Sequence, residues 1–361
     1  MKKILLSILL ISMHIVYAQE PYNILRQAYN DKAPGTSLAI RTEGKTTYHQ
    51  RGLANLEKAY PITMTTHFRM ASVSKQFTAM AIYLLHRQGK LNLENPISKY
   101  LEGLPPRTQA ITISHLLNHT SGLVDYESHI PTHQTAQLTD RDVLHIIADI
   151  DSVYFPAGTR FQYSNTGYCL LALIVEKVAG LSYPDAVKEL IFKPSDIKRA
   201  TVYPTPHDKE RAYGYHPTSV GFRLADQSIT SATKGDGGVY ISMEEYLKWV
   251  NNQNPLWDES YKADLEKYAV YVKDDVYYSL GWFFTRKGRD LFLFHSGEST
   301  GFHNIVVWNM TDNNVLALFS NRDDMKIAEV YDKLMKHQQL TFNLINIPLF
   351  LWLNKVYMND L

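Results

Sequence analysis

The chain has 361 residues, of which 45% are hydrophobic and 20% are charged. This composition is typical of a folded globular protein and excludes the disordered, collagen-like and coiled-coil classes. The 37 basic and 36 acidic residues nearly cancel, so no strong field of one sign indicates a nucleic acid as partner. The single cysteine, Cys169, excludes an internal disulfide framework and any cluster of metal-binding thiolates.

The first 18 residues have the pattern of a secretory signal peptide. Lys2 and Lys3 form a short positive start, and residues 4–17 are mostly apolar. Small or modest residues ending in Ala18 occupy the positions that a signal peptidase reads, which predicts cleavage before Gln19. The alternative is an uncleaved membrane anchor, for which the apolar stretch is short. We therefore expect an exported protein, either periplasmic or extracellular.

The order of the predicted elements indicates one sheet that carries a helical insertion. Alternating and apolar runs predict strands near both ends of the chain, and helical patterns dominate between them. Strands connected in this way belong to the mixed α/β (α+β) class, as an antiparallel sheet flanked by helices. The predicted strands cover residues 36–42, 46–53, 276–286, 291–295, 305–309 and 315–320. The predicted helices cover residues 72–88, 114–118, 140–150, 166–178, 183–192, 242–252 and 324–338.

Ser-x-x-Lys occurs three times, beginning at Ser72, Ser195 and Ser231. Only Ser72 opens a long apolar helix, on which residues three apart share a face, so the Lys75 amine can reach the Ser72 hydroxyl. Burial disfavours a charged lysine and makes its amine a usable base, and the helix start favours negative charge on the serine oxygen. The alternative is that Ser72 is an ordinary helix cap and Lys75 a surface residue.

Two rival patterns are weaker. Residues 297–301 match the G-x-S-x-G nucleophile turn around Ser299, but a strand pattern follows the serine where that turn needs a helix. His115 and His119 have a metal-like spacing, yet Leu116 stands where the zinc-peptidase glutamate would be. We therefore expect a capping or core role for His119.

With these stretches in view, the chain resembles the serine β-lactamase and penicillin-binding-protein superfamily, and within it the class C β-lactamase-like group of peptidases and esterases. The resemblance covers about residues 24–339 and rests on several motifs in the expected order. They are Phe68 to Thr78 around Ser72, Ile113 to Leu123, Phe161 to Asn165 with its Tyr-x-Asn, and His295-Ser296-Gly297. A second Tyr-x-Asn at residues 357–359 lies outside the resemblance and is interpreted as chance.

The resemblance implies roles for these residues. Ser72 would be the acylated nucleophile, Lys75 the amine that helps to deprotonate it, and Tyr163 the partner that relays a proton to the leaving group. Asn165 would donate to a substrate carbonyl. The strand with His295, Ser296 and Gly297 would form one wall of the cleft, and the backbone N–H groups of Ser72 and Glu298 would form the oxyanion hole. No metal or organic cofactor is implied.

The third motif departs from the classical pattern. His295 stands where β-lactamases and D,D-peptidases carry a lysine that helps to hold a substrate carboxylate, and a neutral histidine is a weaker anchor for an anion. We therefore expect an exported serine hydrolase of amides or esters, either a peptidase of D-amino-acid or muropeptide substrates or a carboxylesterase. The alternatives are a true β-lactamase and a catalytically silent binding protein that retains the fold. The expected substrate is a small molecule or peptide.

The predicted organisation has three parts. A signal peptide (1–18) precedes a hydrolase domain (19–339), whose sheet part comprises residues 19–71 and 236–339 and whose helical part comprises residues 72–235. An apolar C-terminal tail (340–361) follows, which is a poor membrane span because it contains Pro348 and several polar residues. We expect the tail to pack against the domain or a second subunit, or to contact a membrane surface through Trp352 and Lys355. Cys169 is expected to fill the core.

Overall fold

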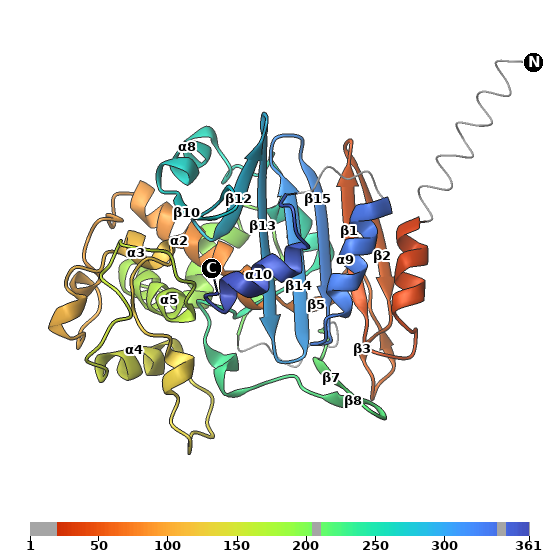
Figure 1. Cartoon of the computed structure of the whole chain (residues 1–361), viewed down its shortest axis with the longest axis horizontal. Coiled ribbons are helices and arrows are strands. Elements are labelled where there is room, and N and C mark those ends of the chain that lie inside the picture. Colours follow the sequence, from red (N-terminus) through yellow and green to blue (C-terminus); the bar gives the residue numbers. More distant parts are fainter. Residues whose placement is uncertain (1–19, 204–210, 338–343, 361) are drawn as a thin grey trace, which may run out of the picture.

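The computed structural model of the protein describes residues 20–203, 211–337 and 344–360, so the predicted signal peptide lies outside the described residues. An eight-stranded antiparallel sheet forms its centre (Figure 1). In spatial order the strands are β10 (Val270–Lys273), β11 (Val276–Ser279), β12 (Trp282–Lys287), β13 (Asp290–Ser299), β14 (Phe302–Asn309), β15 (Asn314–Ser320), β1 (Thr36–Thr42) and β2 (Lys45–Arg51).

The sheet joins the two ends of the chain, as the order of predicted elements indicates. β1 lies between β2 and β15, with Leu38 opposite Leu318. Every residue of β14 is buried, because helices cover both faces of the sheet. Smaller sheets pair β3 (Leu53–Asn55) with β4 (Tyr60–Pro61), β5 (His67–Arg69) with β9 (Val239–Ser242) and β6 (Thr201–Val202), and β7 (Tyr215–Thr218) with β8 (Gly221–Leu224).

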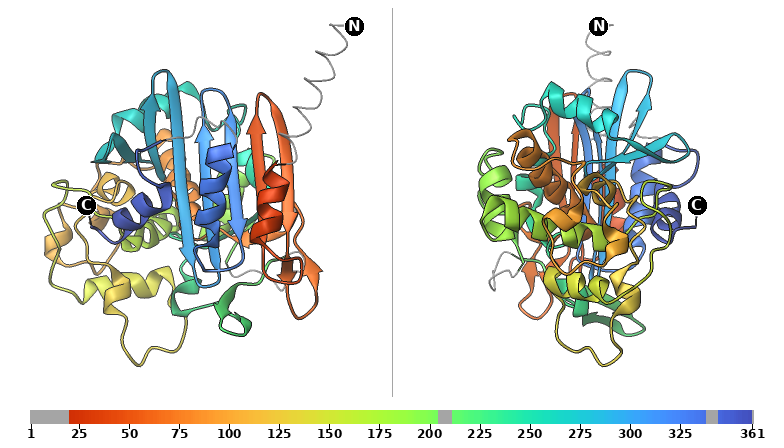
Figure 2. Two further views of the ribbon diagram at one scale, coloured as in Figure 1. Left: turned by 45° about the vertical axis from the view of Figure 1, so that its right-hand side comes forward. Right: turned by 90° about the vertical axis from the view of Figure 1, so that its left-hand side faces the viewer.

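The helices occupy both faces of the sheet and one end of it. Figures 1 and 2 show α9 and α10 over one face, α2 behind the opposite face, and α3, α4 and α5 gathered beside the β10 end. Their bounds are α2 (Lys75–Arg87), α3 (Ile113–Leu117), α4 (Asp140–Ala148), α5 (Asn165–Ala179), α6 (Tyr183–Val187), α7 (Met243–Trp249), α8 (Glu259–Lys267), α9 (Lys326–His337) and α10 (Leu349–Tyr357). Residues 20–28 form a further helix. Within the described ranges, none of the helices is long and apolar enough to cross a membrane.

Local signals set the ends of the helices that frame the site. A capping box between Thr139 and Asp142 begins α4. α5 ends at Gly180, whose φ of 67° is the left-handed conformation that terminates helices. Short 3₁₀ turns complete the helical part: η1 (Ala71–Ser74), η2 (Ile97–Lys99), η3 (Pro106–Thr108), η4 (Tyr126–His129) and η6 (Ile229–Ala232); η5 (Lys188–Phe192) is a π-helical extension of α6.

Three predictions about the elements are wrong in detail. The predicted strand 276–286 is two strands, β11 and β12, because Leu280 and Gly281 have positive φ angles and reverse the chain. A Cβ at Gly281 would lie 2.7 Å from the Lys75 carbonyl oxygen, so the reversal also lets this turn approach α2 closely. The predicted helix 72–88 begins as the 3₁₀ turn η1, and helix α8 was not predicted.

Candidate active site

Ser72 lies in the turn η1, between the strand β5 and the helix α2. The preceding residue, Ala71, has a φ of 48°, a strained conformation for a residue with a side chain. Two neighbouring strands hold this turn: the Met70 N–H donates to the Val239 carbonyl at 2.9 Å, and the Asn304 side chain donates to the Arg69 carbonyl at 2.9 Å. The turn leaves Ser72 partly exposed although its neighbours are buried.

Lys75 is the first residue of α2, and its side chain is fully buried. Its amine donates to the Ser72 hydroxyl at 3.1 Å, to the Asn165 side-chain oxygen at 2.7 Å and to the Asp236 carbonyl at 3.1 Å. Burial lowers the pKa of Lys75, although nearby carboxylates, Asp236 first among them, oppose this shift. The predicted nucleophile and base are therefore in contact, and the amine is tuned toward its neutral form.

Tyr163 lies beside this pair. The Lys75 amine is 5.1 Å from the centre of the Tyr163 ring. The His119 ring also packs against Tyr163, with the two ring centres 4.3 Å apart. Burial raises the pKa of Tyr163 well above its usual value. The phenol is therefore protonated at neutral pH and can donate a proton.

Asn165 begins α5 and lies between the Lys75 amine and the Glu127 carboxyl group. Its oxygen accepts from Lys75, and its amide nitrogen donates to a Glu127 carboxylate oxygen at 2.9 Å. The N–H group that the resemblance assigns to a substrate carbonyl is thus engaged by Glu127, and a substrate must compete for it. Glu127 was missed in the sequence because it lies in the short turn η4, 38 residues from Asn165, and in no recognised motif.

His295 lies within β13 and is completely buried. Its Nδ1 is 2.5 Å from the Ser296 carbonyl oxygen, and since a carbonyl can only accept, Nδ1 carries the proton. Burial lowers the pKa of His295 to about 3, an effect that Lys75 strengthens. The His295 ring is therefore neutral at physiological pH, as expected for a histidine in the third motif.

Gly297 lets β13 approach the turn η1, which carries Ser72. A Cβ there would collide with the Met70 carbonyl oxygen and lie 3.1 Å from the Ser72 backbone nitrogen. The pairing of β13 with β12 stops at Phe294, so no strand of the described residues pairs with residues 295–299 on that side. This open edge, next to Ser72, is where a substrate chain can add as a further strand.

Buried polar atoms without a partner gather at this place. Of the described residues, Tyr163, His119 and His295 each keep a buried hydroxyl or ring nitrogen that makes no hydrogen bond within the protein. Leaving such a group unpaired costs about 1–3 kcal/mol. The Tyr163 ring neighbours both the His119 and the His295 rings, so a ligand bound here can supply partners to these groups.

The other sequence candidates have structural roles. The Ser195 hydroxyl accepts from the Asn254 side chain at 2.9 Å, and the Ser231 hydroxyl accepts from the Ser228 N–H at 2.8 Å. Ser299 ends β13 and is followed by the strand β14, which excludes the nucleophile turn of the G-x-S-x-G pattern. His119 is a core residue, as expected, and its Nδ1 accepts from the Ser164 N–H at 3.2 Å.

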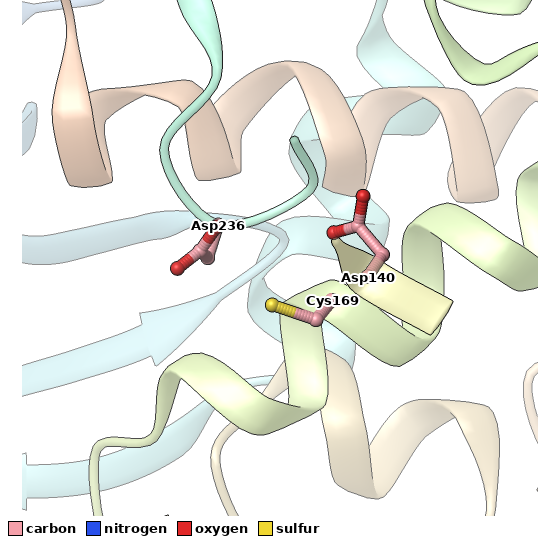
Figure 3. Close-up of side chains that lie close together, drawn as sticks. All are labelled: Asp140, Cys169 and Asp236. Carbon is pink, nitrogen blue, oxygen red and sulfur yellow. The ribbon is translucent and has the colours of Figure 1, made fainter. Parts of the chain in front are cut away.

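Asp140, Cys169 and Asp236 form a buried cluster, shown in Figure 3, with their possible ligand atoms within 4.8 Å of one another. Asp140 accepts from the N–H groups of Lys234 and Gly235, both at 3.1 Å. It thereby anchors the loop whose Asp236 carbonyl accepts from the Lys75 amine. Cys169 lies on α5 and is buried in the core of the protein, as expected.

A residue outside the predicted site also enters it. The Tyr357 hydroxyl, at the end of α10, lies 2.8 Å from the Ser296 hydroxyl. Its ring centre is 4.6 Å from that of Tyr163. The sequence offered only the second Tyr-x-Asn as a signal here, and its interpretation as chance left Tyr357 out of the site.

A family model described as Beta-lactamase matches residues 23–339. The chain belongs to this family. Penicillin-binding protein 4* of Bacillus subtilis is 30% identical over 317 residues, which cover 80% of this chain and 68% of that protein. A beta-lactamase of Escherichia coli K12 is 27% identical over 259 residues, covering 70% of this chain and 66% of that one. The chain thus spans about two thirds of the length of these two curated relatives.

Solved structures agree with this assignment. A penicillin-binding protein from Bacillus halodurans superposes with a TM-score of 0.77 at 27% identity, covering 89% of this chain and 98% of that one. The D-amino acid amidase of Ochrobactrum anthropi shares the fold, with a TM-score of 0.76 at 23% identity over 90% of this chain and 98% of the amidase. The protein is a β-lactamase-related serine hydrolase.

Proposed function

We propose that the protein is exported and hydrolyses neutral esters or amides through an acyl-enzyme on Ser72. The contact between the Lys75 amine and the Ser72 hydroxyl, at 3.1 Å, carries this proposal, because the amine is fully buried and its pKa is lowered. A neutral amine at hydrogen-bond distance from a hydroxyl is a general base for its attack on a carbonyl.

In the proposed reaction Lys75 takes the Ser72 proton while the serine oxygen bonds to the substrate carbonyl carbon. The Tyr163 phenol gives its proton to the leaving group as the old ester or amide bond breaks, and the Lys75 ammonium returns a proton to Tyr163. Water then attacks the acyl-enzyme by the same route in reverse and releases the acid. The Ser72 and Glu298 N–H groups would stabilise the oxyanion.

The electrostatics of the third motif favour uncharged substrates. His295 is neutral, so it supplies no positive charge where a lysine would hold a carboxylate. This supports carboxylesters, or amides and peptides without a carboxylate beside the reacting bond, over β-lactam antibiotics. The export proposal rests on the pattern of residues 1–18 and on the penicillin-binding relatives.

Intact-mass spectrometry after exposure to a fluorophosphonate and to a penicillin tests this proposal. We expect a fluorophosphonate adduct on Ser72 and slower or no penicillin adduct. S72A should abolish labelling and S299A should leave it unchanged. An unlabelled wild-type protein would refute the acyl-enzyme, whereas faster labelling by penicillin would favour a β-lactam-recognising protein.

A further inference from the structure

The helix α10 is fastened to the outer face of the sheet beside the site. Trp352 is buried, packs edge-on against Phe283 of β12 and Phe294 of β13, and donates to an Asp274 carboxylate oxygen at 3.0 Å. Figure 1 shows α10 lying across this face, with its last turn toward the α5 side. The Trp352 packing favours contact with the protein's own domain over a membrane anchor at this residue.

This packing carries Tyr357 into the cleft. Its hydroxyl bonds to the Ser296 hydroxyl at 2.8 Å, and its ring stacks on the His295 ring with centres 6.2 Å apart. The same ring touches Tyr163, the predicted proton donor. The family model ends at residue 339, so Tyr357 lies outside what that model describes.

Tyr357 lies beside one end of the open edge of β13, residues 295–299. Gly297 lies against the Ser72 backbone nitrogen and marks the level of the nucleophile. A substrate held there extends one half toward Glu298 and Ser299 and the other half toward Ser296 and His295. Tyr357 contacts Ser296 and His295, in the second direction, and Ser72 itself stays partly exposed.

We propose that Tyr357 is a specificity-determining residue. It closes the His295–Ser296 end of the edge, so that the enzyme accepts only a short group on that side of the reacting bond. The inference rests on the proposed function, since it concerns the substrate of the same serine. The buried Trp352 and its bond to Asp274 hold α10 on the sheet, so the helix that carries Tyr357 is fixed beside the site.

Two series of esters test this inference. One series lengthens the acyl chain of p-nitrophenyl esters, and the other lengthens the alcohol of acetate esters. In the series that lengthens the half of the ester lying along His295 and Ser296, the wild-type kcat/KM should fall as the group lengthens. For the longest member of that series, Y357A should raise kcat/KM about ten-fold or more. The shortest esters should change less than the longest member, because their groups do not reach Tyr357, so the readout is the ratio of kcat/KM between the longest and the shortest ester.

Y357F keeps the ring and should keep the discrimination. M358A, at the next and highly exposed position of the chain, is the matched control and should behave as wild type. If Y357A folds poorly, Y357L retains part of the apolar contact and should still relax the discrimination. Melting temperatures verify that each variant is folded.

Each other result contradicts the inference in a distinct way. No length dependence in the wild type, or an equal change for all esters in Y357A, would show that Tyr357 does not select substrates. Fluorophosphonate labelling of Y357A but not of wild type would show that Tyr357 blocks Ser72 altogether. Absence of labelling in both proteins would instead refute the proposed function and this inference with it.

Discussion

The Lys75 amine lies closer to the Asn165 side-chain oxygen, at 2.7 Å, than to the Ser72 hydroxyl, at 3.1 Å. Asn165 in turn donates to Glu127, so a neutral amide separates the amine from a carboxylate. This arrangement positions the amine without placing a full negative charge in contact with it. The neutral amine that the proposed mechanism needs depends on this separation.

The substitution N165D should therefore slow acylation near neutral pH. A carboxylate beside Lys75 favours the charged amine and should move the midpoint of the pH–rate profile upward by about one to three units. Fluorophosphonate labelling rates measured across pH test this. N165L, which removes the acceptor without adding charge, should slow labelling without an upward midpoint shift; equal midpoints in N165D and wild type would contradict the argument.

The wild-type acylation rate should rise with pH. Lys75 is a base only when neutral, and its neutral fraction grows as the pH passes its lowered pKa, so the rate should level off below the ordinary lysine pKa of 10.5. With a pKa of about 3, His295 should add no inflection between about pH 5 and 9. H295Q should leave the shape of the profile unchanged, and a lost inflection would place His295 in the proton transfer.

The substitution Y163F should separate activity from stability. The Tyr163 hydroxyl is buried with no hydrogen-bond partner in the described protein, so its removal should leave the melting temperature equal or higher. The kcat should fall about 10²- to 10⁴-fold if the phenol transfers a proton. Thermal unfolding and steady-state kinetics measure both quantities. An active Y163F would remove this residue from the mechanism.

The substitution G297A should damage the site through the backbone. The new Cβ collides with the Met70 carbonyl oxygen and must push β13 away from the turn η1, which carries Ser72. We expect a loss of about 1–3 kcal/mol in stability and of about 10²- to 10³-fold in acylation rate. S299A, two residues along the same strand, is the control. Unchanged kinetics in G297A would argue against β13 as the wall of the cleft.

Asp140 should make the protein less stable as the pH rises. Burial raises the pKa of Asp140 to about 7, so from about pH 4 the unfolded chain releases a proton that the folded protein still holds. Its contribution to stability is therefore complete at low pH and is lost by pH 7. Relative to D140N, the wild-type unfolding free energy should drop by up to about 3 kcal/mol between pH 4.5 and 7.5. Denaturant titrations at both pH values test this; parallel curves would contradict it.

The sequence was most informative where structure is local. Ser72 and Lys75 are three residues apart on one helical turn, so their contact follows from helix geometry alone. The strands at both ends of the chain and the helices between them likewise follow from the period of the apolar residues. The break between β11 and β12 was missed because a positive φ at Leu280 has no signal in hydrophobic pattern.

The sequence by itself predicted the family, the fold class and a nucleophile–base pair, because the motifs that indicate them are short runs of residues that are adjacent in the chain or one turn apart. Only the tertiary structure decided what surrounds that pair. Glu127 reaches Asn165, and Tyr357 reaches Ser296 across 61 residues, through the packing of loops and of α10 on the sheet. Such contacts depend on which surfaces bury each other, and spacing along a single chain does not encode them.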